Sequence, residues 1–240
     1  MHAILLAAGR GRRLESDKPK CLLEIEGKTL LDRHLAAMKE AGVTELSLVV
    51  GYEQDQIRAH VAKSAPALPV TFVENARFVR GSIVSLGCAI ERIYETGGLF
   101  MDADVLYPAS LLARLVSSKH ENCVLVDDQS EETGEEMMVG IKEGRVLAIA
   151  RRVTPLGTWD AIGESVGFAK VGPACARLLG SLIAREIEAD RLDQEYEAAM
   201  NVAFKELPWG YEPVGDAPWT EIDFAEDVEK AKKIAKILAG

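Results

Sequence analysis

Short apolar runs alternate with amphipathic segments along the first half of the chain. The apolar runs are typical of strands buried on both faces, and segments with apolar residues three or four positions apart are typical of helices packed on a sheet. We therefore expect strands at residues 3–8, 46–50, 70–74 and 99–102. We expect helices at residues 30–41, 54–62, 83–95 and 110–118. This alternation predicts an α/β fold with a mainly parallel sheet flanked by helices.

The pattern changes after a further strand expected at residues 123–127. An acidic loop covers residues 127–136, and short strand-like runs follow before the helical pattern returns. We interpret this change as a small subdomain within one domain that covers residues 1–240. The elements expected here are strands at 138–142, 146–150, 166–171 and 211–214, and helices at 173–189, 193–205 and 225–238.

The composition is that of an ordinary globular protein with an acidic balance. The 240 residues include 38 Asp and Glu and 28 Lys and Arg, which gives a formal net charge of −10. Such a chain repels polyanions, so we expect neither nucleic acid nor a membrane surface as a partner. No apolar run reaches the ~20 residues that span a bilayer. The four cysteines form no CxxC pair and are interpreted as reduced thiols of a cytoplasmic protein.

The loop after the first expected strand combines glycine with positive charge. Gly9 and Gly11 can turn the backbone and present N–H groups to an anion without a Cβ in the way. Five basic residues lie within eleven positions of a chain that is acidic as a whole; they are Arg10, Arg12, Arg13, Lys18 and Lys20. This cluster indicates a strongly anionic ligand, and a nucleoside triphosphate is the leading candidate.

Two commoner phosphate-binding motifs fit this region less well. A dinucleotide-binding fingerprint requires a third glycine three residues after Gly11, where the chain has Leu14. A P-loop that ends at residues 27–29 would require glycine in place of Leu22. We interpret residues 27–29 as a turn before a helix.

Two pairs of carboxylates, far apart along the chain, share the same spacing. Asp102 and Asp104 end an expected strand, at the edge of the sheet where open α/β proteins bind ligands. Glu221 and Asp223 form the second pair. Oxygen ligands from two segments suit a Mg²⁺ ion that also bridges substrate phosphates. Together with the basic loop, the two pairs predict a phosphoryl-transfer site that needs no covalent nucleophile.

Several motifs resemble those of the sugar-phosphate nucleotidyltransferases, and more narrowly those of their phosphocholine and phosphonate cytidylyltransferase-like branch. The resemblance covers nearly the whole chain and is specific in the combination of its elements. The motifs are the glycine loop from Leu6 to Leu14, Pro19-Lys20-Cys-Leu22, Val50-Gly-Tyr52, Asn75 followed by Ser82-Ile-Val-Ser-Leu86, Asp102-Ala-Asp104, and the segment from Pro218 to Asp227.

This resemblance implies a Rossmann-like sheet of the A-type glycosyltransferase kind, mixed but mainly parallel, with a small acceptor-binding subdomain. It also implies a Mg²⁺-dependent reaction in which a phosphate or phosphonate acceptor attacks the α-phosphorus of CTP and pyrophosphate is released. Residues 1–126 would then form the nucleotide-binding part, residues 127–215 the acceptor-binding part, and residues 216–240 the metal-ligand segment with the last helix.

By position, the resemblance also implies roles for individual residues. The implied nucleotide-binding residues are Leu6, Ala8, Gly9, Gly11, Arg12, Asn75, Ser82 and Asp102. The implied catalytic residues are Arg13 and Lys20, which would contact the phosphates, and Arg151, which would face the acceptor. The implied metal ligands are Asp104, Glu221 and Asp223.

The chain departs from this family pattern at two positions that concern the acceptor. Met138 stands where many relatives carry a lysine. Ser82-Ile-Val replaces an Asn-Asn-aromatic sequence of the choline-type members. The resemblance therefore leaves the identity of the acceptor open.

The residues favour two kinds of acceptor. Guanidinium groups at Arg77, Arg80, Arg151 and Arg152 favour a small acceptor with a phosphonate or a further anionic group, because they pair with such oxygens as a fork. Carboxylate and hydroxyl groups could instead bind an ammonium or hydroxyl group. The expected acceptor-binding residues are Arg80, Arg152, Glu164, Tyr196 and Glu197.

We therefore expect a cytidylyltransferase, with three alternatives. A non-catalytic nucleotide sensor would bind CTP without turnover, but it need not retain both carboxylate pairs. An NAD(P)-dependent oxidoreductase is disfavoured by Leu14. The same transfer chemistry with UTP or GTP and a sugar 1-phosphate is nearest to the expected activity. The sequence leaves the oligomeric state open, a homodimer included.

Overall fold

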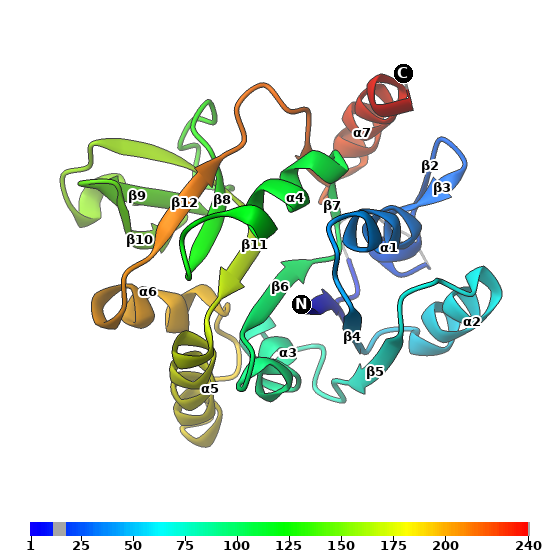
Figure 1. Ribbon diagram of the computed structural model, residues 1–240, viewed down its shortest axis with the longest axis horizontal. Helices are drawn as coiled ribbons and strands as arrows, with labels where there is room; N and C mark the ends of the chain where they lie inside the picture. The colour runs from blue at the N-terminus through cyan, green and yellow to red at the C-terminus, as the bar shows by residue number, and fades with distance from the viewer. Residues whose placement is uncertain (12–17, 240) are drawn as a thin grey trace.

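The computed structural model describes residues 1–11 and 18–239 of the chain. Its centre is a nine-stranded mixed sheet whose main path runs β10-β9-β11-β6-β1-β4-β5, and β8 and β12 join this path through β11 (Figure 1). The predicted Rossmann-like α/β fold is confirmed. The strands are β1 (His2–Ala7), β4 (Glu45–Val50), β5 (Val70–Glu74), β6 (Gly98–Asp102), β8 (Cys123–Asp127), β9 (Met138–Lys142), β10 (Arg145–Ala150), β11 (Ala161–Val171) and β12 (Gly210–Pro213).

The part of the sheet around β1 is parallel. β1 pairs with β4 and with β6, and β5 pairs with β4. Parallel neighbours require crossover connections, which helices supply here. The α-helices of the described residues are α1 (Leu30–Glu40), α2 (Gln54–Ser64), α3 (Ser82–Gly87), α4 (Ala109–Ser117), α5 (Pro173–Glu188), α6 (Glu197–Glu206) and α7 (Ala225–Ala239).

Helices cover both faces of the sheet. Successive residues of a strand point to opposite faces, so Ile4 and Leu5 of β1 belong to two different cores. The core around Leu5 includes buried residues of α1, α2 and α4, and the core around Ile4 includes those of α3, α5 and α6. α7 packs over a third, smaller core that contains Ile222 and Ile234. Both faces of the sheet are thus closed, and its carboxyl edge is left for a site.

β11 connects the parallel part of the sheet to an antiparallel part. It pairs antiparallel with β6, β8 and β9, and its register with β8 shifts between Ser165 and Ala169. Gly167 lies in this bulge with φ +78°, and a Cβ there would come within 2.5 Å of a carboxylate oxygen of Asp102. β11 is longer than the strand predicted at residues 166–171 because its first residues continue beyond the bulge to pair with β9.

The prediction of a single helix at residues 83–95 is wrong. α3 ends at Gly87, and a 3-10 turn at Ile90–Ile93 (η3) follows. Glycine weakens a helix, and a Cβ on Gly87 would lie 2.9 Å from Ile183 of α5. The spacing of apolar residues at 83–95 could not predict this break, because it comes from packing against α5, a distant element of the chain.

Four strands of two residues escaped the sequence pattern, because hydrophobic periodicity cannot resolve such short elements. β2 (Glu24–Ile25) and β3 (Lys28–Thr29) form a hairpin, and Glu26 and Gly27 have the positive φ that a type I′ turn requires. The turn predicted at residues 27–29 lies at Glu26 and Gly27 instead, because Lys28 and Thr29 form β3. The helix expected after it is α1, which the Thr29 hydroxyl caps. The other two short strands, β7 and β13, build the site below.

The four cysteines are free thiols, and Cys21, Cys123 and Cys175 are buried. Burial, with a smaller contribution from Asp104, raises the pKa of the Cys21 thiol to about 12. This thiol therefore stays protonated at neutral pH. Across residues 1–11 and 18–239, every helix is too short or too polar to cross a lipid bilayer.

Candidate active site

A two-stranded ribbon brings distant carboxylates together beyond the carboxyl end of β6. β7 (Val105–Leu106) pairs antiparallel with β13 (Thr220–Glu221), and Glu221 lies opposite Val105. The backbone N–H of Ile222 donates to the carbonyl of Asp104 at 3.0 Å. This pairing holds Asp104 beside Glu221 and Asp223, although the two segments are far apart in the sequence.

Asp104, Glu221 and Asp223 form a carboxylate triad. Each residue offers one oxygen, and the three oxygens lie within 4.8 Å of one another. Carboxylate oxygens are the ligands that Mg²⁺ prefers in proteins. The structure thus brings together the three residues that we expected to hold a metal, and their donor set fits a divalent cation.

Lys20 reaches the carboxylate triad from the 3-10 turn η2 (Lys20–Leu22). Its ammonium donates to Asp104 at 3.1 Å and also to Asp223. Burial alone would lower the pKa of Lys20, but the charges of Asp104 and Asp223 and the hydrogen bonds to them raise that pKa above its ordinary value. Lys20 is therefore a fixed positive charge next to the triad.

The raised pKa of Glu221 also points to a cation site. Burial first, and then the neighbouring charges of Asp104 and Asp223, raise the pKa of Glu221 to about 8, against the opposing effect of Lys20. The Glu221 side chain is open to solvent on the side of a cavity, so protein surrounds its carboxyl group without closing it off. This raised pKa shows that the triad holds more negative charge than Lys20 offsets, and a bound divalent cation would favour the ionised form of Glu221.

A small cavity of about 90 Å³ lies between the first loop and the carboxylate triad. Leu6, Gly9, Gly11, Lys20 and Asp104 are among its lining residues. Gly11 has φ +61°, and a Cβ there would lie 2.5 Å from Cγ of Lys20. Glycine therefore allows the loop to lie against the lysine, and both line one space.

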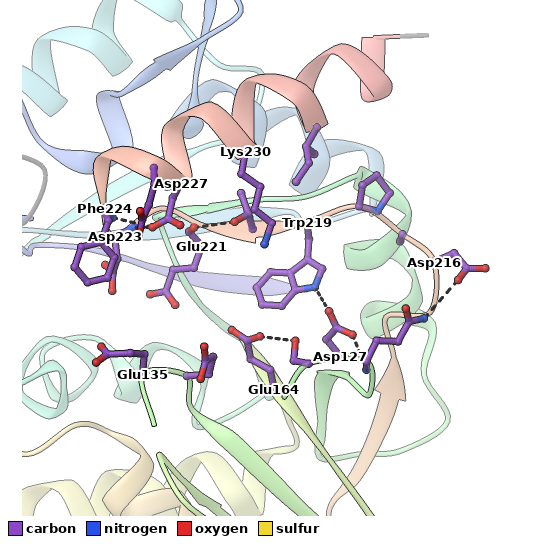
Figure 2. A pocket seen from close by; sticks show the side chains of 18 of the residues that line it. Asp127, Glu135, Glu164, Asp216, Trp219, Glu221, Asp223, Phe224, Asp227 and Lys230 are labelled. Carbon is purple, nitrogen blue, oxygen red and sulfur yellow. Dashed lines mark hydrogen bonds between the residues drawn. The ribbon is translucent and has the colours of Figure 1, made fainter. Parts of the chain in front are cut away.

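A larger cavity of about 680 Å³ opens from the triad, and Figure 2 shows its walls. We call it the large cavity. Glu221 and Asp223 line it, so it adjoins the candidate metal site. Its described lining contains a single basic residue, Lys230, and nine acidic residues. These nine are Asp127, Glu135, Glu136, Glu164, Asp216, Glu221, Asp223, Glu226 and Asp227.

Hydrogen bonds order one wall of the large cavity. The indole N–H of Trp219 donates to Asp127 at 2.7 Å, and the hydroxyl of Ser130 donates to Glu164 at 2.6 Å (Figure 2). Burial raises the pKa of Glu164, and the charges of nearby carboxylates act in the same direction. This wall therefore presents an aromatic ring and carboxylates that already have fixed orientations.

The polar side chains that we expected to bind the nucleotide have partners within the protein. The amide of Asn75 donates to Ser85 at 3.0 Å and accepts the N–H of Arg77 at 2.9 Å. The hydroxyl of Ser82 accepts the N–H of Tyr196 at 3.0 Å. These contacts order the loop after β5 and the start of α3.

The first loop is described only in part. Leu6, Gly9 and Gly11 line the small cavity, whereas Ala8 is buried and its carbonyl accepts the N–H of Tyr52 at 3.0 Å. The implied roles of Arg12 and Arg13 lie outside the described residues.

Asp102 lies two residues before Asp104 but outside the carboxylate triad. The chain turns at residues 103–104, so the two carboxylates do not share a partner. Asp102 accepts the hydroxyl of Tyr196 at 2.7 Å. Burial, followed by the charges of Asp104 and Glu197, raises the pKa of Asp102 well above its ordinary value. Asp102 is thus a buried partner of Tyr196 next to the carboxylate triad.

Three of the arginines expected at the acceptor or in catalysis, Arg80, Arg151 and Arg152, pair with neighbouring segments. Arg80 pairs with Asp193 at 2.6 Å, and Arg151 pairs with Glu195 at 3.0 Å. Arg152 donates to a backbone carbonyl of the acidic loop at 3.0 Å. Among the described residues that line the large cavity there is no arginine, whereas Glu164 lies there as expected.

Tyr196, which we also expected to face the acceptor, is 3% exposed and has its hydroxyl on Asp102. We predict that Tyr196→Phe lowers the free energy of unfolding by about 1 to 3 kcal/mol, because it leaves a carboxylate oxygen of Asp102 without its donor. Urea unfolding measures this loss. Tyr211→Phe is the matched control, because its hydroxyl makes no hydrogen bond to the described residues. An unfolding midpoint equal to that of wild type would contradict the role of this bond.

Glu197 begins α6, and one of its carboxylate oxygens is buried without a hydrogen-bond partner in the described chain. Burial raises the pKa of Glu197 to about 7 from its ordinary value of 4.5. Between these two pH values the folded protein holds a proton that the unfolded chain releases. The stability from this proton is therefore complete below pH 4.5 and is lost as the pH rises to about 7.

We predict that Glu197→Gln removes this pH dependence. Relative to the variant, wild type should lose roughly 2 to 3 kcal/mol of unfolding free energy between pH 4.5 and 7.5. Urea unfolding across this range measures the difference. Glu206→Gln, on the exposed end of the same helix, should follow wild type. Parallel pH profiles for wild type and Glu197→Gln would show that the raised pKa is wrong.

Two functional candidates were missed or undervalued in the sequence. Trp219 lies in the motif from Pro218 to Asp227 without a role of its own, and only the structure places it on the wall of the large cavity. Lys230 lies in the helix expected at residues 225–238, to which no binding role was given. Lys230 follows Asp227 by three residues and Asp223 by seven, and this helical spacing is the signal that could have placed the three on one face.

The fold and the site together correspond to a known class of nucleotide-dependent domain. A family model for the MobA-like NTP transferase domain matches residues 3–197. The chain belongs to this family, which confirms the resemblance to nucleotidyltransferases and argues against an NAD(P)-dependent oxidoreductase.

Curated relatives match this chain over part of their own length. The CTP:phosphoglutamine cytidylyltransferase of Campylobacter jejuni is 32% identical over 136 residues, which is 53% of each chain. The bifunctional IPC transferase and DIPP synthase of Rubrobacter xylanophilus is 27% identical over 240 residues, which covers 97% of this chain and 51% of that protein. The chain therefore spans about half the length of these relatives.

Solved structures share the fold over almost the whole chain. The inositol-1-phosphate CTP transferase from T. maritima aligns with a TM-score of 0.77 and 22% identity, and the alignment covers 98% of this chain and 96% of that chain. The CTP:phosphocholine cytidylyltransferase from Streptococcus pneumoniae aligns with a TM-score of 0.76 and 21% identity over 98% of both chains.

Proposed function

We propose that this protein is a Mg²⁺-dependent cytidylyltransferase, which transfers CMP from CTP to a small phosphate or phosphonate acceptor and releases pyrophosphate. The observation that carries this proposal is the meeting of Lys20 with Asp104, Glu221 and Asp223 between two cavities. The small cavity beside the glycine loop suits the triphosphate. The large cavity suits the acceptor, because it opens onto the same carboxylates.

In the proposed reaction an acceptor oxygen forms a bond to the α-phosphorus of CTP, and the bond from that phosphorus to the bridging oxygen of the β-phosphate breaks. Pyrophosphate leaves with the electron pair of that bond. Lys20, with Arg13 in the implied role, neutralises charge on the triphosphate. An ionised acceptor phosphate needs no general base, so alignment and charge neutralisation carry the reaction.

Asp104, Glu221 and Asp223 would hold the Mg²⁺ ion, which supplies positive charge against the phosphate oxygens when bound. The protein's own contribution is the fixed position of these carboxylates. The ribbon of β7 and β13 sets that position, and Lys20 keeps the repelling side chains of Asp104 and Asp223 together.

Residues 1–126 would bind the nucleotide and residues 127–215 would contribute the acceptor side, with the last segment completing the metal site. The choice of CTP is supported by the names of the relatives and neighbours, which act with CTP. A different nucleotide with a sugar 1-phosphate is the alternative that the same assay tests.

The decisive experiment measures pyrophosphate release by the purified chain with four nucleoside triphosphates crossed with phosphocholine, 2-aminoethylphosphonate and sugar 1-phosphates. We expect release with CTP, with Mg²⁺ present and not with excess EDTA. Greater release with UTP or GTP and a sugar 1-phosphate would replace the proposal by its alternative. CTP binding without release for any acceptor would favour a nucleotide sensor.

A further inference from the structure

Lys230, in the wall of the large cavity, is a charged residue to which the proposed reaction gives no role. Lys230 lies on α7 and is the single basic residue in the described lining, beside nine acidic ones. Within residues 1–11 and 18–239 it forms no hydrogen bond or ion pair. Figure 2 shows its side chain extending from α7 toward the cavity wall at Trp219. A lysine in such surroundings has a positive charge available for a ligand.

The start of α7 is fixed with respect to the carboxylate triad. The carboxylate of Asp227 accepts the N–H of Asp223 at 2.9 Å and the N–H of Phe224 at 2.7 Å. Ala231 and Ile234 anchor the helix in the core below it. Lys230 lies one helical turn after Asp227, so its backbone has a set position relative to the proposed reaction centre.

An acceptor phosphate brings negative charge into a cavity whose described charged residues are all acidic except Lys230. Lys20 already pairs with Asp104 and Asp223, which reduces its attraction for a second anion. The charge of Lys230 reaches across the cavity as far as Glu164. Lys230 is therefore the described cation best placed to offset the charge of an acceptor phosphate.

We infer that Lys230 binds the phosphate or phosphonate of the acceptor, and that the surrounding carboxylates select an acceptor whose remaining part is positively charged. A second negative group would lie against Glu164 or Asp127 and be repelled. An ammonium group would be attracted to the same carboxylates and to the Trp219 ring. This inference rests on the proposed function. It predicts a positively charged acceptor group, whereas the arginines in the sequence favoured a further anionic group.

The test of acceptor charge uses three probes that bind through one phosphate. Phosphocholine carries a positive group, 3,3-dimethylbutyl phosphate has nearly the same shape without the charge, and phosphoglycolate carries a carboxylate. Calorimetry with wild-type protein and Mg²⁺ gives each dissociation constant. We expect phosphocholine to bind about tenfold more tightly than its neutral analogue, and phosphoglycolate to bind most weakly.

The test of Lys230 uses Lys230→Met, which keeps much of the aliphatic stem and loses the charge. We expect its dissociation constant for phosphocholine to rise about 10- to 100-fold, as for the loss of one charged hydrogen bond, while the KM for CTP stays unchanged. Lys230→Arg should recover part of the affinity. Lys233→Ala, exposed on the same helix and outside the cavity, should bind phosphocholine as wild type does.

Equal phosphocholine affinity for wild type and Lys230→Met would overturn the inference, and so would tighter binding of phosphoglycolate than of the neutral analogue. The inference would also be overturned if the wild-type protein bound none of the three probes. Phosphocholine binding without pyrophosphate release in the nucleotide panel would instead overturn the proposed function and leave the assignment of Lys230 standing.

Discussion

Replacing Asp223 with asparagine is expected to reduce turnover by about two orders of magnitude or more while the fold stays intact. Asp223 contributes one oxygen to the carboxylate triad and is a hydrogen-bond partner of Lys20. Asparagine keeps the shape of the side chain but removes the negative charge, so both the cation and the lysine lose a charged partner. Pyrophosphate release at saturating CTP and acceptor, with Mg²⁺ varied, measures the loss.

The expected signature of Asp223→Asn is a lower kcat together with a higher requirement for Mg²⁺. Asp55→Asn is a suitable control, because Asp55 is an exposed residue of α2 away from both cavities. A thermal melt confirms that each variant folds. Near-normal pyrophosphate release from Asp223→Asn at low Mg²⁺ would remove Asp223 from the proposed metal site.

Replacing Lys20 with methionine is expected to have a similarly large effect, again about two orders of magnitude in turnover. The Lys20 ammonium is charged at neutral pH, because Asp104 and Asp223 raise its pKa. Methionine retains the stem that packs on Gly11 and loses the charge that would offset the triphosphate. Pyrophosphate release across a range of CTP concentrations separates the effect on kcat from that on KM.

Lys28→Met serves as the control for Lys20→Met, because Lys28 is an exposed residue of β3. Lys20→Arg tests whether charge alone is enough, and we expect it to recover only part of the activity, since a guanidinium cannot fit the position of an ammonium held between two carboxylates. If Lys20→Met folds and keeps the turnover of wild type, the lysine has no part in catalysis.

The order and type of most elements follow from the sequence. Buried strands such as β1 and β8 are apolar runs with one polar end each, and α1 and α7 show a clear helical period, so local pattern and tertiary burial agree. Disagreements arise where a contact from a distant element interrupts the pattern. The packing of α5 on Gly87 divides the expected helix at residues 83–95 in this way.

The candidate site shows the same division. The spacing of Asp102 and Asp104 suggested a shared ligand, because alternate residues of a strand face the same side. The chain leaves the strand at Asp102 and turns, so Asp104 joins the carboxylate triad while Asp102 pairs with Tyr196. Similarly, the expected acceptor arginines have partners on neighbouring loops, which no local pattern reports.

The sequence by itself determined the α/β fold, the glycine loop with its basic residues, and the two carboxylate pairs, because each depends on residues that are close together in the chain. Only the tertiary structure decided which carboxylates meet around Lys20, and that the adjoining large cavity has acidic walls with Lys230 among them. These features depend on the pairing of β7 with β13 and on the packing of α7. Both join segments that are far apart in the sequence, so no hydrophobic periodicity along the chain can report the contact.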